Sequence, residues 1–175
     1  MRKRCSFRRH QMVMPRRGKL LITSIKEQTV VEADLPSLSV STYVGKLNTA
    51  GSVFNGHRVD DVLLTSPIGI AVTEGRQIVY IGQPNCILSL NMSSDQVFPT
   101  FQTKMATRYL TMLPGDGGLL ISTDSGVVRL MINNSSTTAV LDAETPIEGV
   151  TIGSVQKLLI LDDRFYMATD RIRNR

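Results

Sequence analysis

Short runs of β-favouring residues recur along this chain at a nearly constant spacing. They are LLIT at 20–23, IVYI at 78–81, LLIS at 119–122 and FYMA at 165–168, and successive runs begin 58, 41 and 46 positions apart. Almost no stretch shows the apolar spacing of an amphipathic helix, whereas short apolar runs bounded by turn residues are typical of strands. The sequence therefore predicts an all-β chain with a repeated unit of roughly 40 to 50 residues.

Each run extends into a larger unit of strands joined by turns. The unit at 68–101 contains GIAV, IVYI and CILSL and a fourth strand, with the turns TEGR at 73–76 and QPN at 83–85 between them. The unit at 108–142 repeats that order. Four antiparallel strands joined by tight turns form one blade of a β-propeller, so each of these two units predicts a full blade.

The two ends of the chain hold less than a full unit. Residues 18–45 supply three strands without an opening strand, and residues 157–173 supply two or three. We therefore expect an all-β fold, an incomplete β-propeller of about three to three and a half four-stranded antiparallel blades across 18–175, preceded by a flexible basic tail at 1–17. Open blade edges are normally covered, which predicts that a protein partner, a second copy or the rest of a longer protein completes the ring.

The segment at 40–81 resembles the NHL repeat family. VSTYVG ends an outer strand at Gly45, a loop containing Gly and Asp follows at 51–61, and PIGIAV at 67–72 opens the next unit, in the order that NHL repeats show. FYMATDRIR at 165–173 is similar to the apolar-tyrosine-apolar-Ala-Asp segment that precedes Arg-Ile in this family. The resemblance implies a propeller of NHL-type blades.

Two residues of PIGIAV have separate physical roles. Pro67 stiffens the start of a strand, where the missing N–H donor costs little. Gly69 has no side chain, so we expect a neighbouring backbone to lie close to it. The pattern thus predicts the point at which one blade meets the next.

The positive charge of the chain is concentrated at its two ends. The net charge is +5, and arginines and lysines crowd 2–19 and 171–175, while the part between them is slightly acidic. Such clusters attract nucleic acid, but a terminal arginine run is more often a solvated tail. Some NHL propellers bind RNA, and this stays an alternative. Because the remaining bases are scattered over different units, we do not expect a nucleic-acid partner.

The compartment is not predicted. The basic N-terminal segment lacks the apolar stretch of a signal peptide, and no run approaches the ~20 apolar residues of a membrane span. An Arg-rich, acid-free leader is compatible with a transit peptide. Asn91, Asn133 and Asn134 begin N-glycosylation patterns. They leave an extracellular origin open if the N-terminus is truncated.

The chain offers little for catalysis. Propeller lyases and lactonases of similar fold carry His, Asp and Glu in the central channel, which makes a metal-dependent enzyme the main alternative. Here His57, Asp60 and Asp61 are the candidate metal ligands, since imidazole and carboxylate bind divalent cations. One loop with a single imidazole and two adjacent carboxylates is more often a solvated turn. We expect no metal, no cofactor and no catalytic residue.

Loops on a rigid sheet scaffold are the places where recognition residues concentrate. The sequence therefore favours a non-catalytic protein-interaction module that uses three loops. The predicted contact residues are Gln83, Pro84, Asn85, Asp124, Ser125, Gly126, His57 and Arg58. Cys86, which follows the first loop, is expected as a small buried hydrophobe.

Overall fold

The computed structural model describes residues 11–53, 56–102, 107–122, 127–133, 136–142, 150–152, 155–161, 164–169 and 172–174. Within these ranges the chain forms antiparallel strands and one short 3-10 turn, η1 (Pro114–Asp116). The prediction of an all-β fold is confirmed.

Blade 1 is a complete four-stranded sheet. Its strands, in sheet order, are β1 (Met12–Arg16), β2 (Lys19–Ser24), β3 (Thr29–Asp34) and β4 (Ser39–Val44). The sequence predicts no opening strand here, because the surrounding arginines suggest a tail at 1–17. That expectation is corrected: β1 pairs with β2 through a tight turn at Gly18, whose φ of 75° suits glycine.

Blades 2 and 3 follow with the same antiparallel order. Blade 2 consists of β6 (Gly69–Val72), β7 (Ile78–Gln83), β8 (Cys86–Asn91) and β9 (Gln96–Gln102), with the two-residue strand β5 (His57–Arg58) added beyond β9. Blade 3 consists of β10 (Tyr109–Met112), β11 (Gly118–Ser122), β12 (Val127–Asn133) and β13 (Ser136–Asp142).

The C-terminal strands form two small sheets. In one, β15 (Val155–Leu161) pairs with β16 (Arg164–Thr169), and in the other, β14 (Val150–Ile152) pairs with β17 (Ile172–Asn174). Strand β15 lies beside β10 and β11 of blade 3. These strands therefore continue the array on the side of blade 3 that faces away from blade 2.

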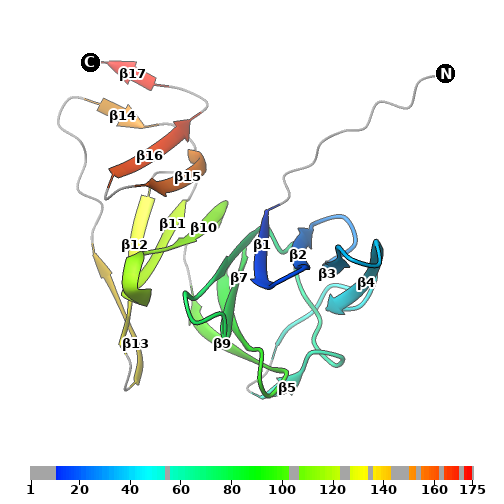
Figure 1. Ribbon diagram of the computed structural model, residues 1–175. Helices are drawn as coiled ribbons and strands as arrows, with labels where there is room; N and C mark the ends of the chain where they lie inside the picture. Colours follow the sequence, from blue (N-terminus) through cyan, green and yellow to red (C-terminus); the bar gives the residue numbers. More distant parts are fainter. Residues whose placement is uncertain are drawn as a thin grey trace.

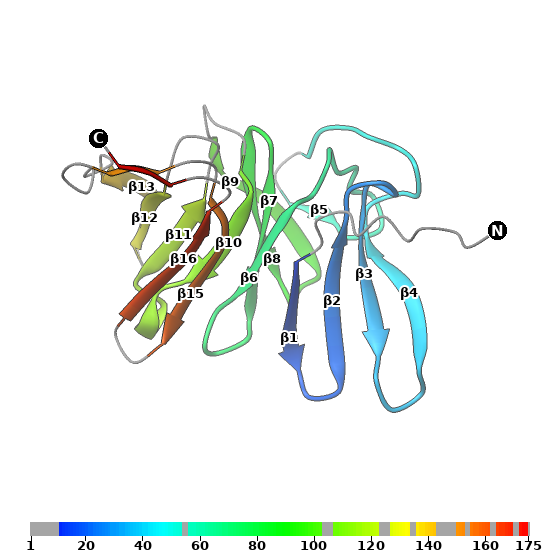
Figure 2. The same cartoon turned by 90° about the horizontal axis from the view of Figure 1, so that it is seen from above.

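The sheets fan out from a common centre (Figure 1, Figure 2). The strands β1, β6, β10 and β15 are neighbours there in chain order, and the other strands of each sheet lie farther from the centre (Figure 2). The described sheets do not form a closed ring. The fold is thus an incomplete β-propeller, as the repeat spacing predicts.

The core consists of two apolar layers on the two faces of blade 2. Alternate residues of β7 supply them, because successive side chains of a strand point to opposite faces. Val79 and Ile81 pack with Leu21 and Val30 of blade 1, whereas Tyr80 packs with the buried residues of blade 3. Truncating such a buried side chain to alanine costs roughly 2–5 kcal/mol, so these layers hold the blades together.

The approach of blade 3 to blade 2 depends on a glycine pair. Gly69 lies opposite Gly82 in the β6–β7 ladder. A Cβ atom at Gly69 would lie 2.8 Å from Leu110 Cγ and 3.2 Å from Leu110 N, and one at Gly82 would lie 2.6 Å from Thr107 Cγ2. The close backbone approach predicted for Gly69 is confirmed.

Candidate interaction site at the turn between β7 and β8

A hollow of about 520 Å³ opens beside the turn that joins β7 to β8. The connection between blades 1 and 2 forms one wall, and strands β8 and β9 form the other. Its lining residues are Gly51, Ser52, Val53, Thr65, Gln83, Pro84, Asn85, Cys86, Leu88, Pro99 and Gln102. The structure therefore brings the predicted loop Gln83, Pro84 and Asn85 into the wall of a concave site.

Gln83 connects the β7–β8 turn to the segment between blades 1 and 2. Its side chain is only 6% exposed, and its Oε1 accepts a hydrogen bond from the backbone N–H of Thr65. The hydroxyl of Thr65 in turn donates to the backbone oxygen of Gly51 at 2.8 Å. Because a backbone N–H can only donate, the acceptor must be the amide oxygen, and this fixes the orientation of the amide group. The NH₂ group of Gln83 is then left as a donor.

Two further side-chain amides of the hollow, those of Asn85 and Gln102, can bind a ligand. The side-chain amides of Asn85 and Gln102 are exposed and bond to no other group in the part of the chain that the structure describes. Asn85 lies in the β7–β8 turn and Gln102 ends β9, and the Cys86–Gln102 pairing of β8 with β9 brings the turn near the end of β9. Sequence reasoning missed Gln102 and Thr65, since only strand pairing and the folded connection place them beside residues 83–85.

Cys86 is half-buried rather than fully buried and lines the hollow. Its Sγ donates to the backbone oxygen of Ile87 at 3.6 Å, and its side chain packs against the layer between blades 1 and 2. Desolvation by burial raises the pKa of the thiol. The expectation of a fully buried hydrophobe is corrected to a side chain with one face on the core and one on the site.

The other predicted loops do not join this site where they are described. His57 and Arg58 form β5 and pair with Val97 and Gln96 at the outer edge of blade 2. Neither lines the hollow. Asp124, Ser125 and Gly126 lie outside the described residues.

The candidate metal ligands form no recognisable centre. Asp61 donates its backbone N–H to the oxygen of Arg58 at 2.9 Å, which closes a turn after β5. Among the described residues, no group of three or more His, Cys, Asp or Glu side chains is placed to hold a metal ion. Metal binding by His57, Asp60 and Asp61 therefore has no structural support.

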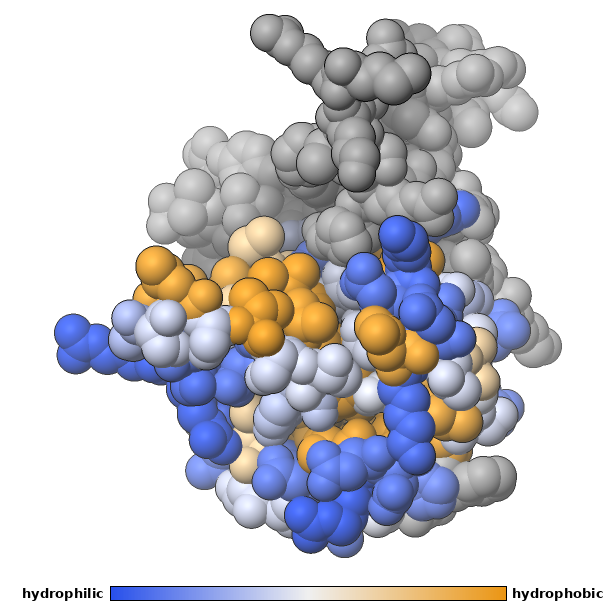
Figure 3. All heavy atoms as spheres, turned by 90° about the vertical axis from the view of Figure 1, so that its right-hand side faces the viewer, coloured by the Kyte–Doolittle hydropathy of each residue, from blue (hydrophilic) through white to orange (hydrophobic). Residues whose placement is uncertain are grey.

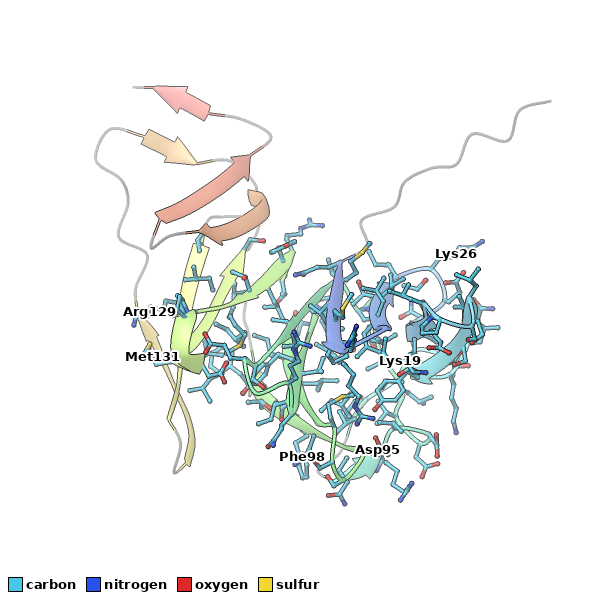
Figure 4. The ribbon with its side chains drawn as sticks, viewed as in Figure 1. Lys19, Lys26, Asp95, Phe98, Arg129 and Met131 are labelled. Atoms are coloured by element: carbon cyan, nitrogen blue, oxygen red, sulfur yellow. The ribbon has the colours of Figure 1, made fainter. Side chains whose placement is uncertain are left out.

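A polar junction fixes blade 1 against blade 2. The hydroxyl of Tyr43 donates to Asp95 Oδ1 at 3.0 Å, and Arg16 Nη2 donates to the backbone oxygen of Met92 at 3.0 Å. Burial, together with the hydrogen bond to Asp95, raises the pKa of Tyr43 to about 12. Asp95 lies in the turn between β8 and β9 and is labelled in Figure 4.

The first glycosylation pattern lies in an exposed turn. Asn91 Oδ1 accepts hydrogen bonds from the backbone N–H groups of Ser93 and Ser94, at 2.9 and 3.3 Å, and so shapes the β8–β9 turn. Asn133 is the last residue of β12, and Asn134 lies outside the described residues.

The labelled basic side chains do not gather on one face. Lys19 and Lys26 lie on blade 1, and Arg129 lies on β12 on the opposite side of the molecule (Figure 4). Lys19 is engaged by Glu32 at 3.0 Å and by Asp34 at 3.6 Å. RNA binding, which requires a continuous basic surface, gains no support from these three positions.

The described residues include no helix long and apolar enough to cross a bilayer. No protein-family model matches the sequence of the chain, and no curated protein does.

Several solved structures resemble the fold of the chain. The chain is similar to hydrazine synthase of Kuenenia stuttgartiensis, with a TM-score of 0.59 and 13% identity over 87% of this chain and 38% of that one.

Two further structures show the same likeness. One is a nidogen/laminin complex, with a TM-score of 0.61 and 16% identity over 87% of this chain and 52% of that one. Another is the extracellular domain of the putative one component system BT4673 from B. thetaiotaomicron, with a TM-score of 0.52 and 15% identity over 92% and 26%. The chain thus spans between 26% and 52% of the length of these three structures.

These neighbours have β-propeller-type folds, and the chain shares that architecture. At identities of 13–16% the likeness concerns the fold alone. The chain is therefore a β-propeller segment, and the NHL resemblance of residues 40–81 remains a resemblance in sequence.

Proposed function

We propose that this chain is a non-catalytic protein-interaction segment of an NHL-like β-propeller, whose ring is completed by further blades. Those blades come from a second copy, from another protein or from a longer polypeptide. The observation that carries the proposal is an apolar sheet face on blade 1 that no other described element covers.

This free face consists of two rows of cross-strand neighbours. Met12, Ile22 and Val31 form one row, and Leu20, Ala33 and Val40 form the other. The outermost members, Met12 and Val40, are 56% and 67% exposed, and the four between them are half-buried. Figure 3 shows apolar side chains gathered in orange patches on the β4 side of the molecule. An exposed apolar patch of this kind marks an interaction surface.

The kind of partner follows from the rest of the array. The opposite face of blade 1 packs on blade 2, and blade 2 is covered on both faces. The free face is apolar, like the faces that meet another blade. A further β-sheet blade, whose inner strand lies beside β1, would give blade 1 the environment that blade 2 already has.

The test is the mass of the 175-residue chain in solution by light scattering, combined with chemical unfolding. Self-completion predicts at least two chains per particle, and Met12→Asp dissociates them because it places a charge in the interface. Leu47→Asp is the control, since Leu47 is 61% exposed but lies off the free face.

Two other outcomes decide the source of the missing blades. A monomer that unfolds at low denaturant and is stabilised by added blades of a longer version supports completion within a longer polypeptide. A highly stable monomer whose free face tolerates Met12→Asp contradicts the proposal, because such a chain would need no further blade.

A further inference from the structure

The hollow beside the β7–β8 turn differs from the free face in its chemistry. None of its lining residues carries a charge, although the chain as a whole is 20% charged. A charged ligand would meet no opposite charge there and would lose hydration. The site therefore fits an uncharged ligand.

The polar groups of the hollow match those of a peptide main chain. A side-chain amide offers one carbonyl acceptor and an NH₂ donor, which is the set that a peptide unit needs. Asn85 and Gln102, which line the hollow, carry both kinds of group, and Gln83 contributes its NH₂ as a donor because Thr65 N–H occupies its oxygen. Gln83 is only 6% exposed, so its amide is held in place before any ligand arrives.

The apolar part of the wall supports the same choice of ligand. Val53, Pro84 and Pro99 offer small apolar surfaces that suit aliphatic side chains. None of the lining residues is aromatic, so a sugar ring would have no flat apolar face on which to stack. The volume of about 520 Å³ lies within the roughly 300–1,000 Å³ of small-ligand sites.

We infer that this hollow is a binding site for an extended, uncharged peptide segment of a partner protein. The amides of Gln83, Asn85 and Gln102 hydrogen-bond its main chain. The inference goes beyond ring completion and concerns a different surface from the free face of blade 1. Loss of one interaction therefore leaves the other intact.

The test uses the full 175-residue chain and three sets of probes. The first is a set of N-acetylated, C-amidated hexapeptides of Ala, Val, Ser, Gln and Pro. The second is the same set with one Lys or Asp, and the third is maltotriose. Binding is followed by NMR shifts of the Thr65 backbone amide and of the side-chain amides of Gln83 and Asn85. Protection of Cys86 from iodoacetamide, in a Cys5→Ser background, is the second readout.

Gln83→Glu is the decisive variant, because its carboxylate can still accept from Thr65 N–H but no longer donates. We expect it to weaken peptide binding by about tenfold, the size of one hydrogen bond. Gln77→Glu is the matched control, since Gln77 is exposed and lies just before the opposite end of β7. Should Gln83→Glu fail to fold, Gln102→Ala, at an exposed position, replaces it.

The expected result is shifts at Thr65, Gln83 and Asn85 with uncharged peptides, protection of Cys86, and normal binding by Gln77→Glu. Equal binding of the charged set, or shifts with maltotriose alone, would overturn the inference. So would the absence of any response to the peptides, or unchanged affinity in folded Gln83→Glu. Light scattering of the same samples shows whether the chain is assembled, so failure here is distinct from failure of ring completion.

Discussion

The side-chain amide of Gln11 donates a hydrogen bond of 2.6 Å to the backbone oxygen of Leu110, 99 residues further along the chain. The amide oxygen of Gln11 accepts from the backbone N–H groups of Ile70 at 2.9 Å and of Leu110 at 3.2 Å. Its own backbone bonds to Thr23 of β2. One buried side chain thus joins the innermost strands of blades 1, 2 and 3.

Replacing Gln11 with alanine is expected to destabilise all three blades. The change leaves the N–H groups of Ile70 and Leu110 without the acceptor that they share, and each unsatisfied buried group costs about 1–3 kcal/mol. We expect the free energy of unfolding to fall by about 2 kcal/mol or more, measured by urea denaturation. Arg17→Ala, at an exposed turn position, is the control. Equal stability of the two variants would contradict the bridging role of Gln11.

Replacing Gly69 with alanine is expected to destabilise the packing of blade 3 against blade 2. The new Cβ would lie 2.8 Å from Leu110 Cγ, and overpacking of this kind costs about 1–3 kcal/mol. Gly75→Ala is the matched control, because nothing lies within 4 Å of its Cβ position. Thermal unfolding of both variants checks the prediction, which fails if Gly69→Ala melts at the same temperature as Gly75→Ala.

Tyr43 makes the stability of the blade 1–blade 2 junction sensitive to alkaline pH. Its pKa rises from 10.0 to about 12 in the folded protein, so folding disfavours the tyrosinate. The contribution is complete below pH 10 and is lost as the pH rises through 12. We expect the wild type to lose more stability than Tyr43→Phe across this window, since both proteins retain the other tyrosines. Parallel pH profiles of the two proteins would show that Tyr43 does not titrate as described.

The thiol of Cys86 is expected to react slowly at neutral pH. Burial raises its pKa, and the thiolate is the reactive form. Iodoacetamide should therefore modify Cys86 more slowly in the folded protein than in urea, and the rate should keep rising above the pH at which a free thiol is fully ionised. Mass spectrometry of the Cys5→Ser protein measures both rates. Equal rates in the two states would show that the hollow does not shield the sulfur.

Much of the fold follows from local patterns. The strands of blades 2 and 3 are short apolar runs bounded by turn residues, and such hairpins are encoded within a few residues. The glycine of PIGIAV also has a local meaning, which the contact of Gly69 with Leu110 confirms. The sequence pattern does not predict strand β1, because Arg16 and Arg17 follow its apolar residues and suggest a solvated tail.

The sequence by itself determined the all-β class, the blade period and the place of the turn at Gln83, because these depend on residues close together in the chain. Only the tertiary structure decided that Gln11 meets Leu110, that Thr65 and Gln102 flank the β7–β8 turn, and which face of blade 1 stays uncovered. These relationships join residues far apart in sequence. They exist only after the blades have packed around a common centre and set the register of one sheet against the next.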